Sequence, residues 1–280
     1  MRLWGKRSVA IAALIALQTI FFSCSSGPRP PEKGTPAFDW QLAQKRYADG
    51  DYLGTIEALE RIVASENEVT ARAMPWLLVM TSGMTRGYME VADHFEGGAR
   101  INKADPTSFR RQTSQNRNAA GRMALRFAEA FGSFQTRTED PVVLDFAFPT
   151  GSAAPVAMLT KVSNGMLPPS NEIEAGLRAA MRRAVLLNTC RAVGSPDDAA
   201  KTQEIFKAGE VKLPRTEFVL AMAAAMHDTA EVYSRNKLDD PQKMEIFCTR
   251  AQEALKSVPE SKERKELLAK IAATLKKIKS

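Results

Sequence analysis

The amino-acid sequence predicts an all-α protein of about ten helices with an irregular central connection. Three observations predict this fold class. Apolar residues recur at spacings of three and four along most of the chain, almost no segment alternates as a strand would, and Pro or Gly punctuates segments of helical length. The 44% hydrophobic content, which includes 13 Phe, is enough to fill a core and excludes a disordered chain.

The first 23 residues have the layout of a secretory signal peptide. Arg2, Lys6 and Arg7 precede an uninterrupted apolar run from Val9 to Leu17. No later apolar stretch approaches the length of about 18 residues that a membrane-spanning helix needs, which excludes a polytopic membrane protein. The net charge is 39 − 32 = +7, and removal of the three cations of residues 1–23 leaves 36 − 32 = +4.

The end of this segment, Phe21-Phe22-Ser23-Cys24, resembles a bacterial lipoprotein signal, although lipoproteins usually carry a small residue at the position of Phe22. The resemblance implies that Cys24 is lipidated and becomes the new N-terminus. Because Ser25 rather than an acidic residue follows, it also implies a location in the cell envelope, at the outer membrane facing the periplasm. An ordinary cleaved secretory signal or an uncleaved anchor would be the alternatives.

The remainder divides into four segments by composition. Residues 24–36, rich in Pro, Ser and Gly, are expected to form a tether. Residues 37–135 are expected to hold N-terminal helical repeats, residues 136–170 an irregular connection, and residues 171–280 a C-terminal helical region.

Start and stop signals place the helices of the N-terminal part. Gly50-Asp51 separates a first helix from a second, whose apolar residues share one face. Pro75-Trp76 is taken as the start of a third helix that ends near Gly83, Tyr88–Ile101 as a fourth, and Asp105-Pro106 as the N-cap and first turn of a fifth. The ten helices are expected at about residues 38–48, 53–63, 75–83, 88–101, 106–134, 170–192, 196–208, 214–235, 240–258 and 261–278.

Five prolines and two glycines interrupt residues 136–170. Within them, Pro155–Val162 could hold a short helix. The apolar run Val142–Phe148 is too hydrophobic for free solvent, so it is expected to pack over a helix face or to form an isolated extended segment.

A repeat of helix pairs is suggested by Trp76, by Ala92 sixteen residues later, and by Ala99 after a further seven. This spacing resembles the tetratricopeptide pattern, as does the turn Gly50-Asp51-Tyr52, while Met244, Cys248 and Ala251 resemble a degenerate third repeat. The resemblance implies a right-handed solenoid of antiparallel helix pairs. Exported lipoproteins of this kind are similar to the T component of TRAP transporters, which implies a periplasmic solute-binding protein as partner. A non-repeating helical domain is the alternative.

In such a solenoid the first helix of each pair lines a concave groove, which would bind a peptide or protein partner. The residues expected there are Trp40, Gln44, Tyr47, Leu77, Thr81 and Met84. The same aromatic stripe would also suit packing in a core.

No nucleotide-binding, hydrolase or metalloprotease motif occurs in the chain, and no cofactor is expected. The two histidines each lie four residues from a glutamate, His94 after Glu90 and His227 before Glu231. Either pair could ligate a metal from one helix face, so a helical metal-binding or enzymatic domain centred on His94 and His227 is the rival hypothesis.

A basic face is expected on the fifth helix at Arg111, Arg122 and Arg126. No aromatic residues are interleaved there, so nucleic acid is not an expected partner. A solvated helix face or attraction to anionic lipid would explain it. Cys190 and Cys248 could form a disulfide or be two separate core residues. The sequence therefore predicts a non-catalytic, membrane-tethered binding or scaffold lipoprotein of the bacterial cell envelope.

Overall fold

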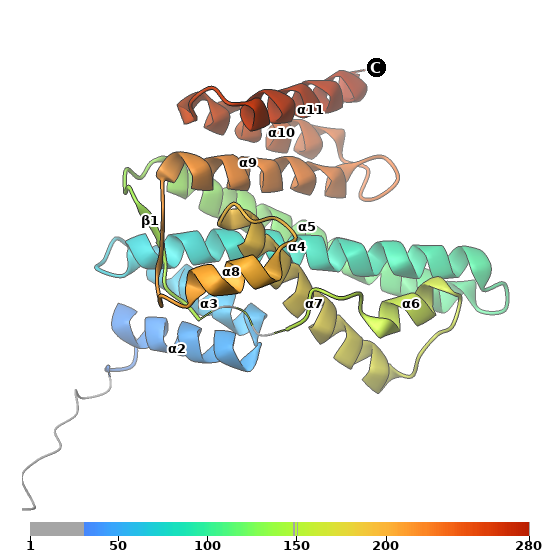
Figure 1. Ribbon diagram of the computed structural model, residues 1–280. Coiled ribbons are helices and arrows are strands. Elements are labelled where there is room, and N and C mark those ends of the chain that lie inside the picture. Colours follow the sequence, from blue (N-terminus) through green and yellow to red (C-terminus); the bar gives the residue numbers. More distant parts are fainter. Residues whose placement is uncertain (1–30, 148, 150, 280) are drawn as a thin grey trace, which may run out of the picture.

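The computed structural model describes residues 31–147, 149 and 151–279 (Figure 1). Cys24 and the proposed signal peptide of residues 1–23 lie outside the described residues. The described chain is almost entirely helical, which confirms the all-α prediction. Its helices are α2 (Pro36–Asp49), α3 (Tyr52–Val63), α4 (Thr70–Ile101), α5 (Pro106–Gln135), α6 (Ala157–Ser163), α7 (Ser170–Ala192), α8 (Ala199–Phe206), α9 (Arg215–Ala230), α10 (Pro241–Ala254) and α11 (Lys262–Lys279).

The helices are stacked in layers. The long hairpin α4–α5 occupies the middle, α2 and α3 lie on one side of it, and α9, α10 and α11 follow one another on the other side (Figure 1). A single cluster of buried apolar side chains includes residues from α2 through α11, so the segments 37–135 and 171–280 share one hydrophobic core. Nowhere in the described part of the chain is a helix both long and apolar enough to cross a bilayer.

Side-chain caps mark where α2, α3 and α5 begin. Thr35 Oγ1 accepts a hydrogen bond from Phe38 N, so α2 begins at the last residue of the proposed tether. Gly50, at φ +75°, ends α2 in the left-handed conformation that glycine tolerates. The carboxylates of Asp51 and Asp105 then accept hydrogen bonds from the first turns of α3 and α5.

The prediction of separate helices at residues 75–83 and 88–101 is wrong, because α4 runs unbroken from Thr70 to Ile101. Pro75 lies in its second turn. Gly83 and Gly87 do not end the helix but allow α7 to cross it closely: a Cβ on Gly83 would lie 3.0 Å from Val185 Cα, and one on Gly87 2.9 Å from Ala184 Cβ. The helix pair on which the tetratricopeptide likeness depended is therefore one helix.

Residues 136–170 are less irregular than expected. Val142–Leu144 forms strand β1, which pairs antiparallel with β2 (Val211–Leu213), and α6 is the short helix anticipated at residues 155–162. Phe146, after β1, is 1% exposed and stacks on Trp76 with ring centroids 4.6 Å apart. The apolar run thus packs over helix faces as expected, because Phe146 covers the aromatic side chains of α2 and α4, whereas the extended segment is not isolated but pairs with β2.

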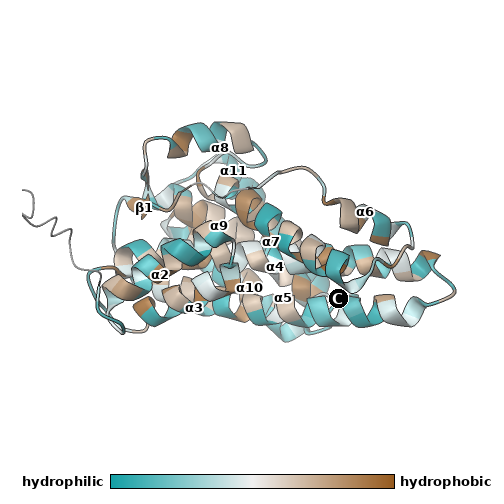
Figure 2. Cartoon of the chain, turned by 90° about the horizontal axis from the view of Figure 1, so that it is seen from below, coloured by the Kyte–Doolittle hydropathy of each residue, from teal (hydrophilic) through white to brown (hydrophobic). Residues whose placement is uncertain are grey.

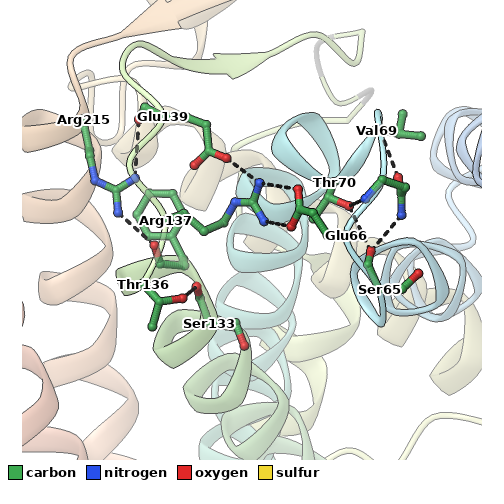
Figure 3. Close-up of polar contacts among 11 residues, drawn as sticks. Ser65, Glu66, Val69, Thr70, Ser133, Thr136, Arg137, Glu139 and Arg215 are labelled. Atoms are coloured by element: carbon green, nitrogen blue, oxygen red, sulfur yellow. Dashed lines mark hydrogen bonds and ion pairs between the residues drawn. The ribbon is translucent and has the colours of Figure 1, made fainter.

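Two arginines connect the layers through polar contacts (Figure 3). Arg137, just after α5, donates to both oxygens of Glu66 in the α3–α4 turn, at 2.7 and 3.1 Å, and also to Glu139. Arg215, at the start of α9, donates to the carbonyl of Phe134 at 2.8 Å and lies over its ring at 4.2 Å. The α3–α4 turn, the end of α5 and the start of α9 are thereby held together.

Candidate functional site

The groove expected from the repeat pattern is not formed by its predicted residues. Trp40, Tyr47, Leu77, Thr81 and Met84 are all buried, and Gln44 is half-buried. Their shared stripe faces the core because α2 packs against α3 and Phe146 covers the aromatic side chains. These residues are core packing, which was the other interpretation of the stripe.

Burial also determines the state of the two cysteines. Cys190 on α7 and Cys248 on α10 are free thiols, each completely buried, so the possible disulfide is not formed. Burial raises the pKa of both thiols, that of Cys248 to about 11. Because the thiolate is the reactive form, neither group is suited to nucleophilic chemistry.

The two histidines lie on different helices, and each contacts a hydroxyl group of a distant segment. His94 Nδ1 lies 2.5 Å from Ser163 Oγ of α6, and His227 Nε2 lies 3.0 Å from Thr274 Oγ1 of α11. Glu90, the expected partner of His94, instead accepts from Arg183 Nη1 at 2.8 and 2.9 Å. Within the described residues, no three His, Cys, Asp or Glu side chains are grouped as metal ligands.

A polar cleft of about 460 Å³ lies where α4, α7 and α9 meet. Its four cations and four acids balance, and most of them are already engaged in ion pairs such as Arg183–Glu90 at 2.8 Å and Arg191–Asp228 at 2.7 Å. The charged residues are Arg86, Glu90, Asp93, Arg183, Arg191, Asp228, Glu231 and Lys237. The ion pairs that line the cleft therefore hold α4, α7 and α9 together.

The predicted basic face is partly confirmed. Arg111 and Arg122 are exposed on α5, whereas Arg126 is half-buried and lies 3.3 Å from Glu60 of α3. Arg126 thus helps to hold α3 against α5, and only the other two present a free positive charge to solvent.

A larger hollow, here called the α9–α11 groove, has a volume of about 830 Å³ and lies between α9, α11 and the turn after α7. Half-exposed Leu220, Ala221 and Ala224 of α9 form one wall, and Leu267 of α11 contributes to the other. Because the alanine side chains are small, they leave space between α9 and α11. The hollow persists because α11 packs mainly on α10 and is fastened to α9 by the His227–Thr274 contact.

The rim of the α9–α11 groove is acidic. Its charged lining comprises the cations Arg191 and Lys270 and the acids Glu217, Asp228, Glu260, Glu263 and Glu266, which gives 2 − 5 = −3. This local charge is opposite in sign to the net charge of +7 of the chain. An apolar floor bordered by carboxylates is complementary to an amphipathic segment with basic residues.

Sequence reasoning missed this groove, although signals for it exist. In α9 the apolar residues are not confined to one face, so a part of them must either meet another helix or remain exposed. Glu263 and Glu266 are three residues apart and therefore lie on one side of α11, and Glu260 lies three residues earlier, just before the helix begins. Neither signal shows that the two faces meet, because that depends on how α11 packs.

Comparison of the chain with known proteins found no matching family model, no matching curated protein and no matching solved structure.

Proposed function

We propose that this protein is a non-catalytic lipoprotein of the bacterial cell envelope, anchored through Cys24, whose α9–α11 groove binds a basic, amphipathic segment of a partner protein. The observation that carries the proposal is the combination of an apolar floor with an acidic rim of charge −3. A cationic helix or strand would bury its apolar side chains on Leu220, Ala221 and Ala224, while the rim carboxylates attract its basic residues.

The helical architecture supports this role over enzymatic chemistry. Burial raises the pKa of both cysteines and makes them poor nucleophiles, and each histidine joins its helix to a distant segment through a hydroxyl group, Ser163 for His94 and Thr274 for His227. A hydroxyl group beside an imidazole is also the pairing of an activated nucleophile, so these two contacts are where an enzymatic site would have to be sought. Glu90, which a metal site at His94 would need, is bound by Arg183. A metal site at His94 would have to break the Arg183–Glu90 and His94–Ser163 contacts first.

The finer features of the prediction are part of the same proposal. Helix hairpins α2–α3, α4–α5 and α9–α10 are stacked in sequence order, which is compatible with a degenerate tetratricopeptide-like solenoid (Figure 1). Attachment at the outer membrane facing the periplasm would present the groove to a soluble envelope protein. A solute-binding protein of a transporter is the partner that the TRAP resemblance suggests.

The lipid anchor is tested by intact mass spectrometry of protein recovered from its native envelope. Acylation predicts a mature chain that begins at Cys24 and carries the mass of its fatty acids. An unmodified chain, or one that keeps residues 1–23, would contradict the anchor without affecting the groove.

The groove is tested with a photo-crosslinking residue at position 220, on the groove wall, and separately at position 276, on the exposed side of α11. We expect one protein to be crosslinked at position 220 and no protein to be crosslinked at position 276. Ala221→Arg should abolish this crosslink, because the substitution fills the groove and adds a positive charge to it, whereas Ala272→Arg at an exposed position of α11 should not. Equal crosslinking in both variants would overturn the groove assignment.

Charge complementarity is tested separately by titration with a basic amphipathic model peptide and its acidic counterpart. Only the basic peptide should bind, and Ala221→Arg should weaken its binding at least about tenfold. Preference for the acidic peptide would contradict the proposed partner chemistry.

A further inference from the structure

One end of the molecule is formed by two loops that are bonded to each other. The turn between α4 and α5 and the loop between α6 and α7 meet at the right-hand end of Figure 1, and we call them together the tip. Asn102 Nδ2 donates to the carbonyl of Gly165 at 2.9 Å, while Asn102 Oδ1 accepts from Ala104 N and Asp105 N at 3.0 and 2.9 Å. The side chain of Asn102 thus organises its own turn and fastens the second loop to it.

The tip exposes large apolar side chains. Ile101 is 59% exposed, Met166 54% and Leu167 40%, and these are three of the six large hydrophobic residues that are exposed among the described residues. Gly165 lies directly against Ile101, since a Cβ on that glycine would be 2.9 Å from Ile101 Cγ2. The three exposed residues therefore lie in adjoining loops at one end of the molecule, and apolar residues exposed together usually indicate an interaction site. Figure 2 shows the hydropathy of each residue along the ribbon, with hydrophilic and hydrophobic residues side by side within most helices.

A basic hollow of about 500 Å³ adjoins the apolar residues. Five cations and one acid line it, which gives 5 − 1 = +4, and they come from the end of α4, from α5 and from the segment after α9. The residues are Glu96, Arg100, Lys103, Arg110, Arg117 and Lys237.

The one acid of this hollow is already neutralised. Glu96 is held by Arg117 at 2.6 Å and by Arg100 at 3.0 Å. Lys103 and Arg110 are exposed and have no acidic partner among the described residues. Asp105, the other carboxylate nearby, caps α5 by accepting from Ser108 N at 3.1 Å. The tip therefore has unpaired positive charge immediately beside its apolar side chains.

We propose that the tip is a second membrane-attachment point, which binds an anionic lipid surface independently of any acylation at Cys24. Ile101, Met166 and Leu167 would enter the interface between headgroups and acyl chains, while Lys103 and Arg110 pair with lipid phosphates. A lipid surface fits better than the groove of a partner protein, because the exposed apolar residues lie in loops at one end of the molecule instead of lining a concave wall.

The test is sedimentation of the chain from Ser25 to Ser280 with vesicles. This chain lacks the proposed lipidation site but keeps the whole described hydrophobic core. Binding is expected to vesicles of phosphatidylcholine containing phosphatidylglycerol, to fall with added salt, and to be weak on phosphatidylcholine alone. Equal binding to both vesicle types, or to neither, would overturn the proposal.

Two sets of variants assign the binding to the tip. Lys103→Gln with Arg110→Gln should reduce the partition coefficient about 25-fold, since each cation near an anionic surface contributes a factor of about five. The matched pair Arg122→Gln with Lys276→Gln, which removes the same charges from exposed positions elsewhere, should change it less than about twofold. Equal losses in the two pairs would show a diffuse charge effect and would contradict a tip-specific contact.

The apolar contribution is measured with Met166→Ser and Leu167→Ser together, which should weaken binding about tenfold while Ile246→Ser, at another exposed apolar position, leaves it unchanged. A site for a free anion predicts a different result. If inorganic phosphate bound at the tip, in a manner abolished by the Lys103–Arg110 variant, and vesicles did not sediment the protein, the membrane proposal would be wrong.

Discussion

The two halves of α4 are alike in length and differ in almost every other respect. Every residue from Ala73 to Thr85 is buried, so this half is surrounded on all sides by α3, α5, α7 and β1. From Tyr88 to Ile101, buried positions alternate with half-buried and exposed ones. The first half organises the core, whereas the second half lines the polar cleft and ends in the tip. One continuous helix thus connects the scaffold to surfaces that are available for binding.

This difference explains the largest error in predicting the fold. An amphipathic helix is recognised from the period of its apolar face, but a helix that is buried all round has no such period. Without it, the sequence predicts that a helix ends near Gly83, although Gly83 and Gly87 lie inside α4 and admit the backbone of α7. The amphipathic helices α3, α5 and α11 were predicted within a few residues of their observed bounds.

The largest effect is expected in the buried half, from Trp76→Ala. Trp76 is completely buried and stacks on Phe146, so truncation should lower the free energy of unfolding by about 3–5 kcal/mol in urea titrations followed by circular dichroism. Trp76→Phe is the control. It keeps a ring and removes an indole N–H that has no partner, and should lower stability by less than about 1.5 kcal/mol. Similar losses in the two variants would contradict the role of the stacked ring.

The next effect concerns the crossing of α4 and α7. Alanine is a better helix former than glycine by about 1 kcal/mol. However, a methyl group at position 83 would lie 3.0 Å from Val185 Cα, a backbone atom that cannot move aside easily. Gly83→Ala should therefore be destabilising by about 1–3 kcal/mol overall. A gain in stability would show that the two helices can separate freely.

In the exposed half, Glu90→Gln should lower the free energy of unfolding by about 1 kcal/mol. The substitution removes the negative charge and leaves Arg183 with one neutral amide oxygen in place of two carboxylate oxygens, besides the carbonyl of Ala153. The loss should shrink at high salt, because both side chains are only partly buried. Arg178→Gln, which removes an exposed cation 4.0 Å from Glu174, is the control and should have almost no effect.

The smallest effect is Gly97→Ala, which should be stabilising by about 0.5–1 kcal/mol. No atom lies within 4 Å of the added Cβ, so only the helical preference of alanine acts. The same substitution is thus expected to have opposite signs at positions 83 and 97 of one helix. Equal signs would contradict the distinction between the two halves.

Much of the fold was predictable because start and stop signals are local. Asp105 caps α5 and Gly50 ends α2 as expected, and Asp51 and Asp240 also cap helices at the expected boundaries. The antiparallel pairing of β1 with β2 was not predictable, since it joins segments about 70 residues apart that are each only three residues long.

The candidate sites were harder to predict from the sequence than the helices. The stripe of Trp40 and Tyr47 has the same pattern whether it lines a groove or fills a core, and only Phe146, about 100 residues away, decides between them. The α9–α11 groove and the tip depend in the same way on contacts between distant segments. By contrast, the positive charge around residues 100–126 was visible in the sequence, and the structure separates it into paired and unpaired arginines.

The length of α4 limits how the protein could lie on a membrane. Its 32 residues span about 48 Å at 1.5 Å per residue. The proposed tether leads into α2 at the end of the molecule opposite the tip (Figure 1). Between Cys24 and Thr35, that tether could reach about 40 Å when fully extended. Because this reach is shorter than α4, simultaneous contact by the lipid anchor and the tip would exclude an upright orientation and tilt the long axis toward the bilayer, with the stacked helices α9, α10 and α11 free to face sideways or outward.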